Sequence, residues 1–277
     1  MIPIRIKQFP NFVRQISSRN RVLWQPVSGK PTFHLCFFSC QSYFKYLYCA
    51  LHSLEHQIHE ISFKVLIFSD EEMPLSSEQV NAIQSLIPNV RVIPWPKSMG
   101  WGATQISWIW RAYGLAAETA AENDVIARID SDVFFFNDRI FRAVARSKAD
   151  LIGDGHYVNF EYCQGGCYFF RASAVKKITE MLNRESIENI LSEISTVVED
   201  IAAFHFAKRL GLKTWLTWFM MFPDELRNAN GLSKWQRFKF SCAHFVMKNK
   251  DAMLAAYEHE VLRDRVPESY RHVLNIQ

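Results

Sequence analysis

The chain has 277 residues, of which 49% are hydrophobic and 14% are aromatic, with 32 basic and 28 acidic side chains. This length predicts one large domain or two small ones, with a core that needs no disulfide or structural metal. The aromatic content excludes a low-complexity disordered chain, and the longest apolar runs fall well short of the roughly 20 residues that span a bilayer.

The excess of positive charge lies in the first predicted element, a basic N-terminal arm over residues 1–30. This arm carries six basic side chains and no acidic one: Arg5, Lys7, Arg14, Arg19, Arg21 and Lys30. Because apolar residues are interleaved with the charges, the arm either packs on the domain or contacts an anionic membrane surface. It does not have the uninterrupted apolar segment of a signal peptide. The remaining residues are slightly acidic and contain no RNA- or DNA-reading motif, which argues against a nucleic-acid partner.

Beyond the arm, the sequence contains no repeat and no linker, and it predicts a single domain over residues 31–277. The strands and helices expected from periodicity alternate: strand 32–40, helix 44–58, strand 63–68, helix 77–86, strand 90–93, helix 104–122 and strand 124–132. Pro94 and Pro96 are expected to end the third strand. This alternation predicts an α/β fold with a mostly parallel central sheet and helices on both faces. Ligands of such sheets bind at the carboxyl ends of the strands, near Asp70 and Asp130.

The fourth predicted strand ends in two carboxylates, Asp130 and Asp132. Side chains alternate along a strand, so these two point the same way and Ser131 points the opposite way. Two converging carboxylates repel each other unless a cation lies between them. Their hard oxygen atoms suit Mg²⁺ or Mn²⁺, which keeps coordination positions open for phosphate. The alternative interpretation is a simple turn, since Asn137 and Asp138 follow closely.

An apolar strand that ends in Asp-x-Asp, after alternating strands and helices, resembles the nucleotide-sugar glycosyltransferases of the GT-A fold. Three later motifs follow in the order typical of that family: the Gly165–Gly166 pair, Glu199–Asp200 at the start of a helix, and His244. The resemblance covers roughly residues 32 to 250. It implies a Rossmann-related three-layer α/β/α fold, a divalent cation (Mn²⁺ or Mg²⁺) and a nucleoside-diphosphate sugar as donor.

The resemblance also implies roles for the residues of these motifs. Asp130, Asp132 and His244 would hold the metal, and Gly165 and Gly166 would lie near the donor sugar and the acceptor. Asp200 matches the catalytic base of the inverting members.

Each later motif also has a structural interpretation. The glycine pair could form a tight turn between two strands, Asp200 could be a helix N-cap, and His244 could be a core or surface histidine. A helix N-terminus is expected to lower the pKa of Asp200, which keeps it ionised but makes it a weaker base.

Two further residues are assigned to the donor by the resemblance. Asp70 resembles the second-strand carboxylate that contacts the base or ribose. Arg111 lies on the helix before the Asp-x-Asp strand, where several such families place a basic residue near the diphosphate; alternatively, it faces water. The tryptophans at 101, 108 and 110 line the donor site or belong to the core.

The cysteines are Cys36, Cys40, Cys49, Cys163, Cys167 and Cys242. In the absence of an export signal, reduced thiols in the cytoplasm are expected. A zinc site that combines Cys163 and Cys167 with Cys242 and His244 is the alternative. Buried small hydrophobic residues are favoured, because the second pair is cramped and far along the chain.

The sequence therefore predicts a metal-dependent, inverting glycosyltransferase. A sugar nucleotidyltransferase is disfavoured, because residues 39–43, after the first strand, contain no glycine. A retaining enzyme and a non-catalytic scaffold with the same fold are the alternatives. A basic rim suggests a glycan or lipid-linked acceptor at the inner membrane face, as in bacterial surface-polysaccharide synthesis; it comprises the arm and Lys234, Arg237, Lys239, Lys248 and Lys250.

Overall fold

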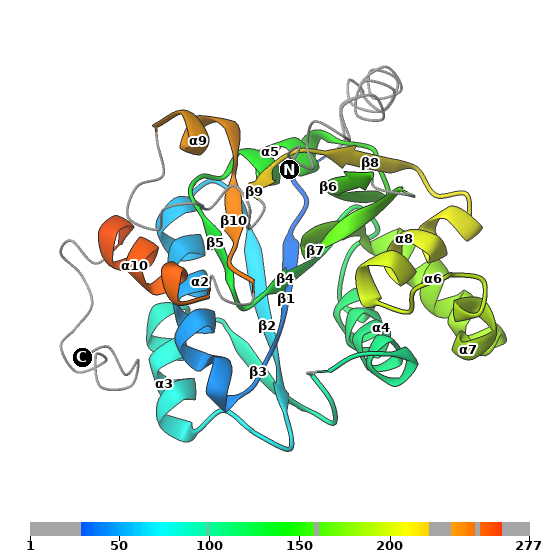
Figure 1. Cartoon of the computed structure of the whole chain (residues 1–277), viewed down its shortest axis with the longest axis horizontal. Coiled ribbons are helices and arrows are strands. Elements are labelled where there is room, and N and C mark those ends of the chain that lie inside the picture. Colours follow the sequence, from blue (N-terminus) through cyan, green and yellow to red (C-terminus); the bar gives the residue numbers. More distant parts are fainter. Residues whose placement is uncertain (1–28, 99, 158–160, 222–233, 247–249, 262–277) are drawn as a thin grey trace.

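The structure is a computed structural model that describes residues 29–98, 100–157, 161–221, 234–246 and 250–261. These residues form a seven-stranded sheet in the order β3-β2-β1-β4-β7-β6-β8, shown in Figure 1. Its strands are β3 (Arg91–Trp95), β2 (Phe63–Asp70), β1 (Phe33–Ser39), β4 (Val125–Asp130), β7 (Glu161–Arg171), β6 (Leu151–Tyr157) and β8 (Thr214–Thr217). A small second sheet contains β5 (Val133–Phe135), β10 (Cys242–His244) and β9 (Met220–Met221).

The large sheet is mostly parallel, which confirms the prediction. β1 lies parallel to β2 on one side and to β4 on the other. The chain therefore builds outward from β1 to β3 and then returns to the other side of β1 with β4. β7 is antiparallel both to β4 and to β6. The reversal of strand order between β1 and β4 is the kind of position where open α/β sheets bind ligands.

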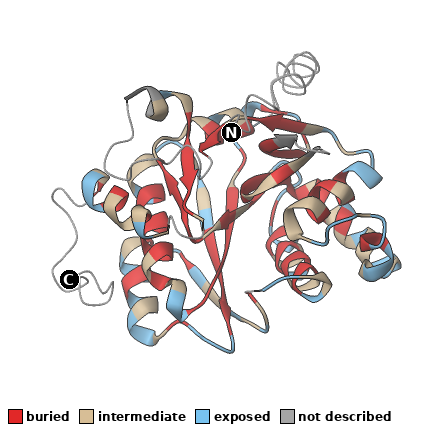
Figure 2. Cartoon of the chain, in the orientation of Figure 1, coloured by how far each residue is buried: buried red, intermediate tan, exposed pale blue. Residues whose placement is uncertain are grey.

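Helices cover both faces of the large sheet, as predicted. One face is covered by α2 (Phe44–Gln57), α3 (Ser77–Leu86), α5 (Arg139–Arg146), α10 (Lys250–Glu260) and the small sheet; the other by α4 (Ala103–Glu118), α6 (Ala172–Arg184), α7 (Ile187–Leu191) and α8 (Glu199–Arg209). Side chains alternate along β1. Leu35 and Phe37 pack in the core under the first group of helices, and Cys36 and Phe38 pack in the core under the second group. Figure 2 shows these strands buried between the layers.

Local sequence explains several element boundaries. Ser76 caps α3 and exchanges hydrogen bonds with Gln79 in a capping box. The expected strand end at Pro94 is wrong, because β3 continues to Trp95. β3 is the edge strand of the sheet, where a missing N–H group is tolerated. Two short helices complete the described elements, the 3₁₀ helix η1 (Gln41–Tyr43) and α9 (Lys234–Lys239).

The glycine pair lies inside β7 itself and not in a turn between strands. This position overturns the turn interpretation, because the glycines belong to the strand that pairs with β4.

All six cysteines are buried with free thiols, as expected of small hydrophobic residues. No cysteine belongs to a metal-ligating group within the described residues, which leaves the zinc alternative without support there. In the same part of the chain, no helix is both long and apolar enough to cross a bilayer. Residues 1–28 lie outside the described residues, so the arm and the domain division stay predictions.

Candidate functional site

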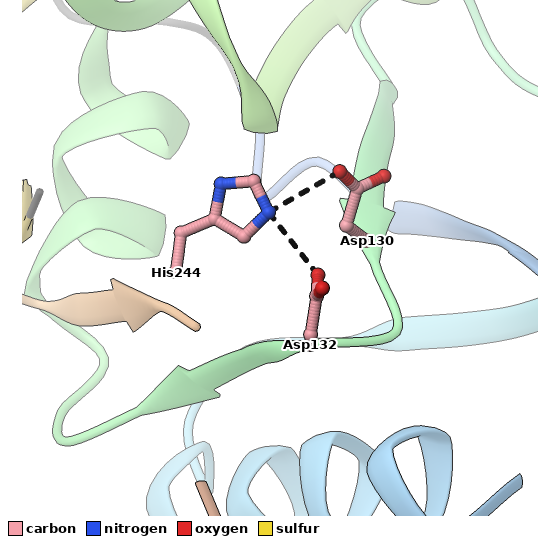
Figure 3. Close-up of side chains that lie close together, drawn as sticks. All are labelled: Asp130, Asp132 and His244. Carbon is pink, nitrogen blue, oxygen red and sulfur yellow. Dashed lines mark hydrogen bonds and ion pairs between the residues drawn. The ribbon is translucent and has the colours of Figure 1, made fainter. Parts of the chain in front are cut away.

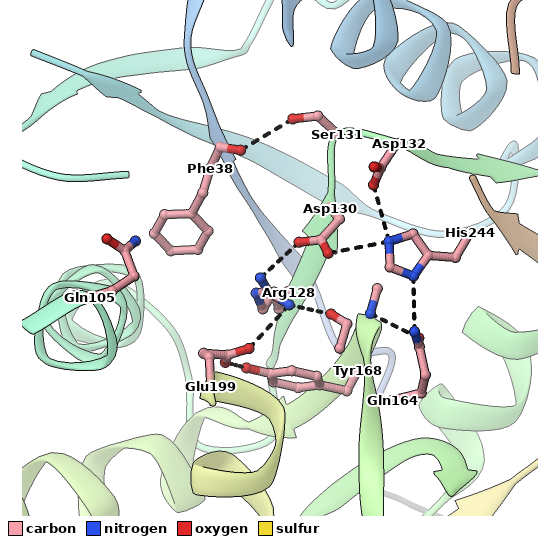
Figure 4. A network of polar contacts seen from close by, with 12 residues as sticks. Phe38, Gln105, Arg128, Asp130, Ser131, Asp132, Gln164, Tyr168, Glu199 and His244 are labelled. Atoms are coloured by element: carbon pink, nitrogen blue, oxygen red, sulfur yellow. Dashed lines mark hydrogen bonds and ion pairs between the residues drawn. The ribbon is translucent and has the colours of Figure 1, made fainter. Parts of the chain in front are cut away.

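The site lies where β1 and β4 end side by side. Phe38 near the end of β1 pairs with Asp130, the last residue of β4. After β4 the chain turns through Ser131, whose hydroxyl donates to the carbonyl of Phe38 over 3.2 Å. Ser131 thus points toward β1, while the two aspartates point together toward His244, as predicted (Figure 4), although β4 ends at Asp130 and Asp132 lies in the turn that follows.

Asp130, Asp132 and His244 converge on one point (Figure 3). Nε2 of His244 lies 3.1 Å from Oδ1 of Asp132 and 3.4 Å from Oδ2 of Asp130. One potential ligand atom from each side chain lies within 4.8 Å of the others. Burial lowers the pKa of His244, but the two carboxylates outweigh burial and raise it to about 9. The cluster joins residues that are 112 positions apart in the sequence.

His244 is held in place by β7. Nε2 of Gln164 lies 3.0 Å from Nδ1 of the imidazole, and the N–H of Gly166 donates to Oε1 of Gln164 over 2.9 Å. A Cβ atom on Gly166 would lie 2.6 Å from Cγ of His244 and closer still to Nδ1. Gly166 therefore serves the site by its lack of a side chain.

Lys250 is the second partner of Asp132. Its Nζ lies 3.2 Å from Oδ2 of Asp132 and donates to the hydroxyl of Tyr43 over 2.6 Å. Burial raises the pKa of Asp132, but His244 and Lys250 outweigh burial and hold it below its usual value. The sequence assigns Lys250 only to the basic rim. In the fold it contacts Asp132, a candidate metal ligand.

Arg128 provides a second cation, from the interior of β4. Its Nη2 lies 2.8 Å from Oδ1 of Asp130, and its Nη1 lies 3.1 Å from Oε2 of Glu199. Nη1 also donates to the carbonyl of Gly165. Burial lowers the pKa of Arg128, but Asp130 and Glu199 outweigh it, so the pKa is raised and the group is charged.

Glu199 opens α8, with Val198 as the N-cap residue. The hydroxyl of Tyr168 donates to Oε1 of Glu199 and lies 2.9 Å from the hydroxyl of Tyr113 on α4. Burial raises the pKa of Glu199 to about 8, although Arg128 acts in the opposite direction.

Asp200 lies in the first turn of α8 and is not its N-cap. Its Oδ1 accepts the N–H of Ile201 over 2.9 Å. Burial nevertheless raises its pKa, against the opposing effects of Arg128 and of this backbone hydrogen bond. The expected lowering by the helix N-terminus is therefore wrong, because burial dominates.

These side chains surround one cavity of 530 Å³. The predicted site residues that line it are Asp130, Asp132, Gly165, Asp200 and His244. Trp101, with 83% of its surface exposed, also lines it, whereas Trp110 is buried in the core.

Asp70 and Arg111, which the resemblance assigns to the sugar donor, do not line the cavity. The carboxylate of Asp70 accepts the N–H groups of Glu72 and Ser98, both over 3.0 Å, and thereby holds the loop that precedes α4. Arg111 is exposed on α4, with its guanidinium 4.6 Å from the ring centre of Trp108. Their roles at the donor stay predictions.

Sequence reasoning gave no role to Arg128, Tyr168 or Gln164. One pattern did point to Arg128: it is a charged residue in an apolar strand, two positions before Asp130 and therefore on the same face. The partners of Tyr168 and Gln164 come from distant segments, which no local pattern reveals.

No family model and no curated protein sequence matches this chain. Solved structures do match. The galactosyltransferase LgtC in complex with donor and acceptor sugar analogs aligns with a TM-score of 0.52 and 13% identity, over 87% of this chain and 99% of its own. An active-site mutant of LgtC aligns equally well. The apo bifunctional glycosyltransferase WbbM aligns with a TM-score of 0.55 and 10% identity, over 91% of this chain and 52% of its own.

The fold is that of the GT-A glycosyltransferases. A structural match at so low an identity shows the fold alone. The chemistry has to be argued from the residues of the site. The three candidate metal ligands fit a divalent cation, since two carboxylates and one imidazole already present their ligand atoms within 4.8 Å of one another. Such mixed oxygen and nitrogen donors suit Mn²⁺, and the carboxylates alone suit Mg²⁺.

Proposed function

We propose that this chain is a glycosyltransferase that moves a sugar from a nucleoside-diphosphate sugar to a hydroxyl of an acceptor, with the help of Mn²⁺ or Mg²⁺. The observation that carries the proposal is the cluster of Asp130, Asp132 and His244 at the point where strand order reverses in a GT-A fold. A scaffold protein has no need to bring two carboxylates and a histidine together beside a cavity.

The charges of the cavity support an anionic donor. Asp130, Asp132 and His244 would hold the cation, which, when bound, stabilises negative charge on the leaving diphosphate. Lys250, which also lines the cavity, supplies a further positive charge for the phosphates. Gly165 lines the cavity beside Asp200 and leaves room for the donor sugar and the acceptor.

We assign Asp200 as the general base. The acceptor hydroxyl oxygen would attack the anomeric carbon while the bond from that carbon to the diphosphate oxygen breaks. Asp200 would take the hydroxyl proton, and the nucleoside diphosphate would leave with the bonding electrons. The raised pKa of Asp200, caused by burial, makes it a better base than an exposed aspartate. A single displacement of this kind inverts the anomeric configuration.

The acceptor we propose is a glycan or a lipid-linked saccharide, as in bacterial surface-polysaccharide synthesis at the inner membrane face. The support is the basic rim, of which Lys30, Lys234, Arg237, Lys239 and Lys250 lie in the described residues. Residues 1–28 of the arm and Lys248 lie outside them, so contact with a membrane is a proposal that rests on sequence alone. Loss of liposome association on removal of residues 1–28 would support it.

The test of the proposed function is binding of nucleoside diphosphates and nucleotide sugars, measured as a shift in melting temperature with and without Mn²⁺. A Mn²⁺-dependent shift with one nucleotide, followed by transfer to an acceptor, is expected. Absence of any shift from folded protein would contradict the proposal. Metal-dependent binding without turnover on any acceptor would favour a non-catalytic scaffold.

A further inference from the structure

Arg128 lies beside the cavity, and the chemistry proposed above gives it no role. It lies in the middle of β4, and only 14% of its side chain is exposed. A buried guanidinium destabilises the fold unless charged partners and hydrogen bonds compensate. The reason for Arg128 must therefore lie in its contacts.

These contacts join three separate segments of the chain. Arg128 binds Asp130 on its own strand, the carbonyl of Gly165 on β7 and the carboxylate of Glu199 at the start of α8. Figure 4 shows the guanidinium between these elements. The planar fork of an arginine directs its N–H groups to several partners at once, whereas a lysine offers one compact ammonium.

Glu199 extends this connection to α4. Its carboxylate accepts from Tyr168, whose hydroxyl lies 2.9 Å from that of Tyr113. The ring of Tyr168 also lies under the guanidinium, with its centre 6.0 Å from the central carbon of Arg128. The segment around Asp130 is thereby linked to β7, α8 and α4 by one chain of polar contacts.

We infer that Arg128 is a positioning residue: it holds the metal ligand Asp130, the Gly165 carbonyl and the start of α8 in one fixed arrangement. Because Asp200 follows Glu199 directly, the same contacts hold the candidate base relative to the metal cluster. The inference rests on the proposed function for what is assembled, and on the contacts of Arg128 for how it is assembled.

A simpler role for Arg128 would be to neutralise the nearby carboxylates. The two roles predict different results for Arg128→Lys, which keeps the charge and removes the fork. If neutralisation is the whole role, the lysine variant binds Mn²⁺ as the wild type does. If positioning is the role, Asp130 loses its fixed orientation and the variant binds Mn²⁺ more weakly.

The first experiment is a titration with Mn²⁺ alone, in which electron paramagnetic resonance measures the concentration of the free ion. We expect Arg128→Lys to raise the Kd for Mn²⁺ by about tenfold to a hundredfold, as is usual when a residue that orients a metal ligand is replaced. The matched control is Arg146→Lys, on the exposed last turn of α5. Equal affinity of Arg128→Lys and the wild type would overturn the inference.

A double-mutant cycle tests the link through Glu199. Glu199→Gln does not touch a metal ligand, but it replaces the carboxyl group that contacts Arg128 with an amide. We expect it to raise the Kd for Mn²⁺. The Kd of the double variant should be no higher than the higher of the two single-variant values. Fold changes that multiply would show two independent effects, and they would contradict the connection.

Hydrogen exchange of the metal-free protein supplies a readout that needs no ligand. In Arg128→Lys, we expect faster amide exchange in β7 over residues 161–168 and in the first turn of α8, with the rest of the sheet unchanged. Unchanged exchange in both segments would overturn the inference. If the wild type binds no Mn²⁺, the proposed function fails, and exchange alone decides the role of Arg128.

Discussion

The backbone of Gly166 lies directly against the imidazole ring of His244, at a distance that leaves no room for a side chain. β7 and β10 belong to different sheets, and this contact brings them together at the candidate metal cluster. A glycine is required here because of the close approach and not because of an unusual backbone angle, since Gly166 is not among the glycines with positive φ.

We therefore expect Gly166→Ala to displace His244. Overpacking of this kind costs about 1–3 kcal/mol of folding free energy, and it should also weaken Mn²⁺ binding. The matched control is Gly114→Ala on α4, whose Cβ would lie at an ordinary contact distance of 3.5 Å from Cγ2 of Thr179. Denaturant unfolding and a Mn²⁺ titration measure both effects, and equal results for the two variants would contradict the explanation.

Asp132→Asn should remove a metal ligand while keeping the size of the side chain. We expect transfer and donor hydrolysis to fall by more than about a hundredfold, because a catalytic metal contributes several kcal/mol to the transition state. Asp138→Asn, which breaks a surface pair with Arg142, is the control. Full activity of the Asp132 variant would show that this carboxylate holds no catalytic ion.

Asp200→Asn separates binding from chemistry. We expect Mn²⁺-dependent nucleotide binding to persist while transfer falls by roughly a hundredfold to ten-thousandfold, the usual contribution of a general base. The anomeric configuration of the product, read by NMR, checks the same assignment. A product with retained configuration would mean that Asp200 is not the base and would favour the retaining alternative.

Stability of the metal-free protein should fall as the pH rises. The pKa of Glu199 is about 8 in the folded chain against an ordinary 4.5, and that of His244 is about 9 against 6.5. In both cases the folded state binds more protons than the unfolded state, so stability is lost between about pH 4.5 and pH 9. Each group contributes a slope of at most about 1.4 kcal/mol per pH unit.

The variant Glu199→Gln isolates one of these groups. It should flatten the loss of stability between about pH 5 and pH 8, measured by urea unfolding at a series of pH values. The same slope in the variant and in the wild type would show that Glu199 ionises normally.

Trp101→Ala tests the exposed wall of the cavity. An indole that stacks on a ligand ring contributes about 0.5–1.5 kcal/mol, so we expect KM for the donor to rise several-fold with little change in Tm. Phe238→Ala, at a side chain that is 73% exposed and not part of the lining, is the control. An unchanged KM would remove Trp101 from the binding site.

The periodicity of the sequence determined the layout of the fold and the place of the first two candidate metal ligands, Asp130 and Asp132. Strands and helices of regular length predict a sheet covered on both faces, and an apolar strand followed by Asp-x-Asp places Asp130 and Asp132 together at the carboxyl end of that strand. These are local properties, because they depend on the direction of side chains along one strand and on the burial of one face.

Only the tertiary structure decided which distant residues complete the site. His244 reaches Asp132 because β10 pairs with β5, and Lys250, the first residue of α10, contacts both Asp132 and Tyr43. Because β7 pairs with β4, the glycine pair lies in a strand and not in a turn. Because Asp200 is buried, its pKa is raised and not lowered. Pairing partners and burial depend on how the whole chain packs, which no single segment encodes.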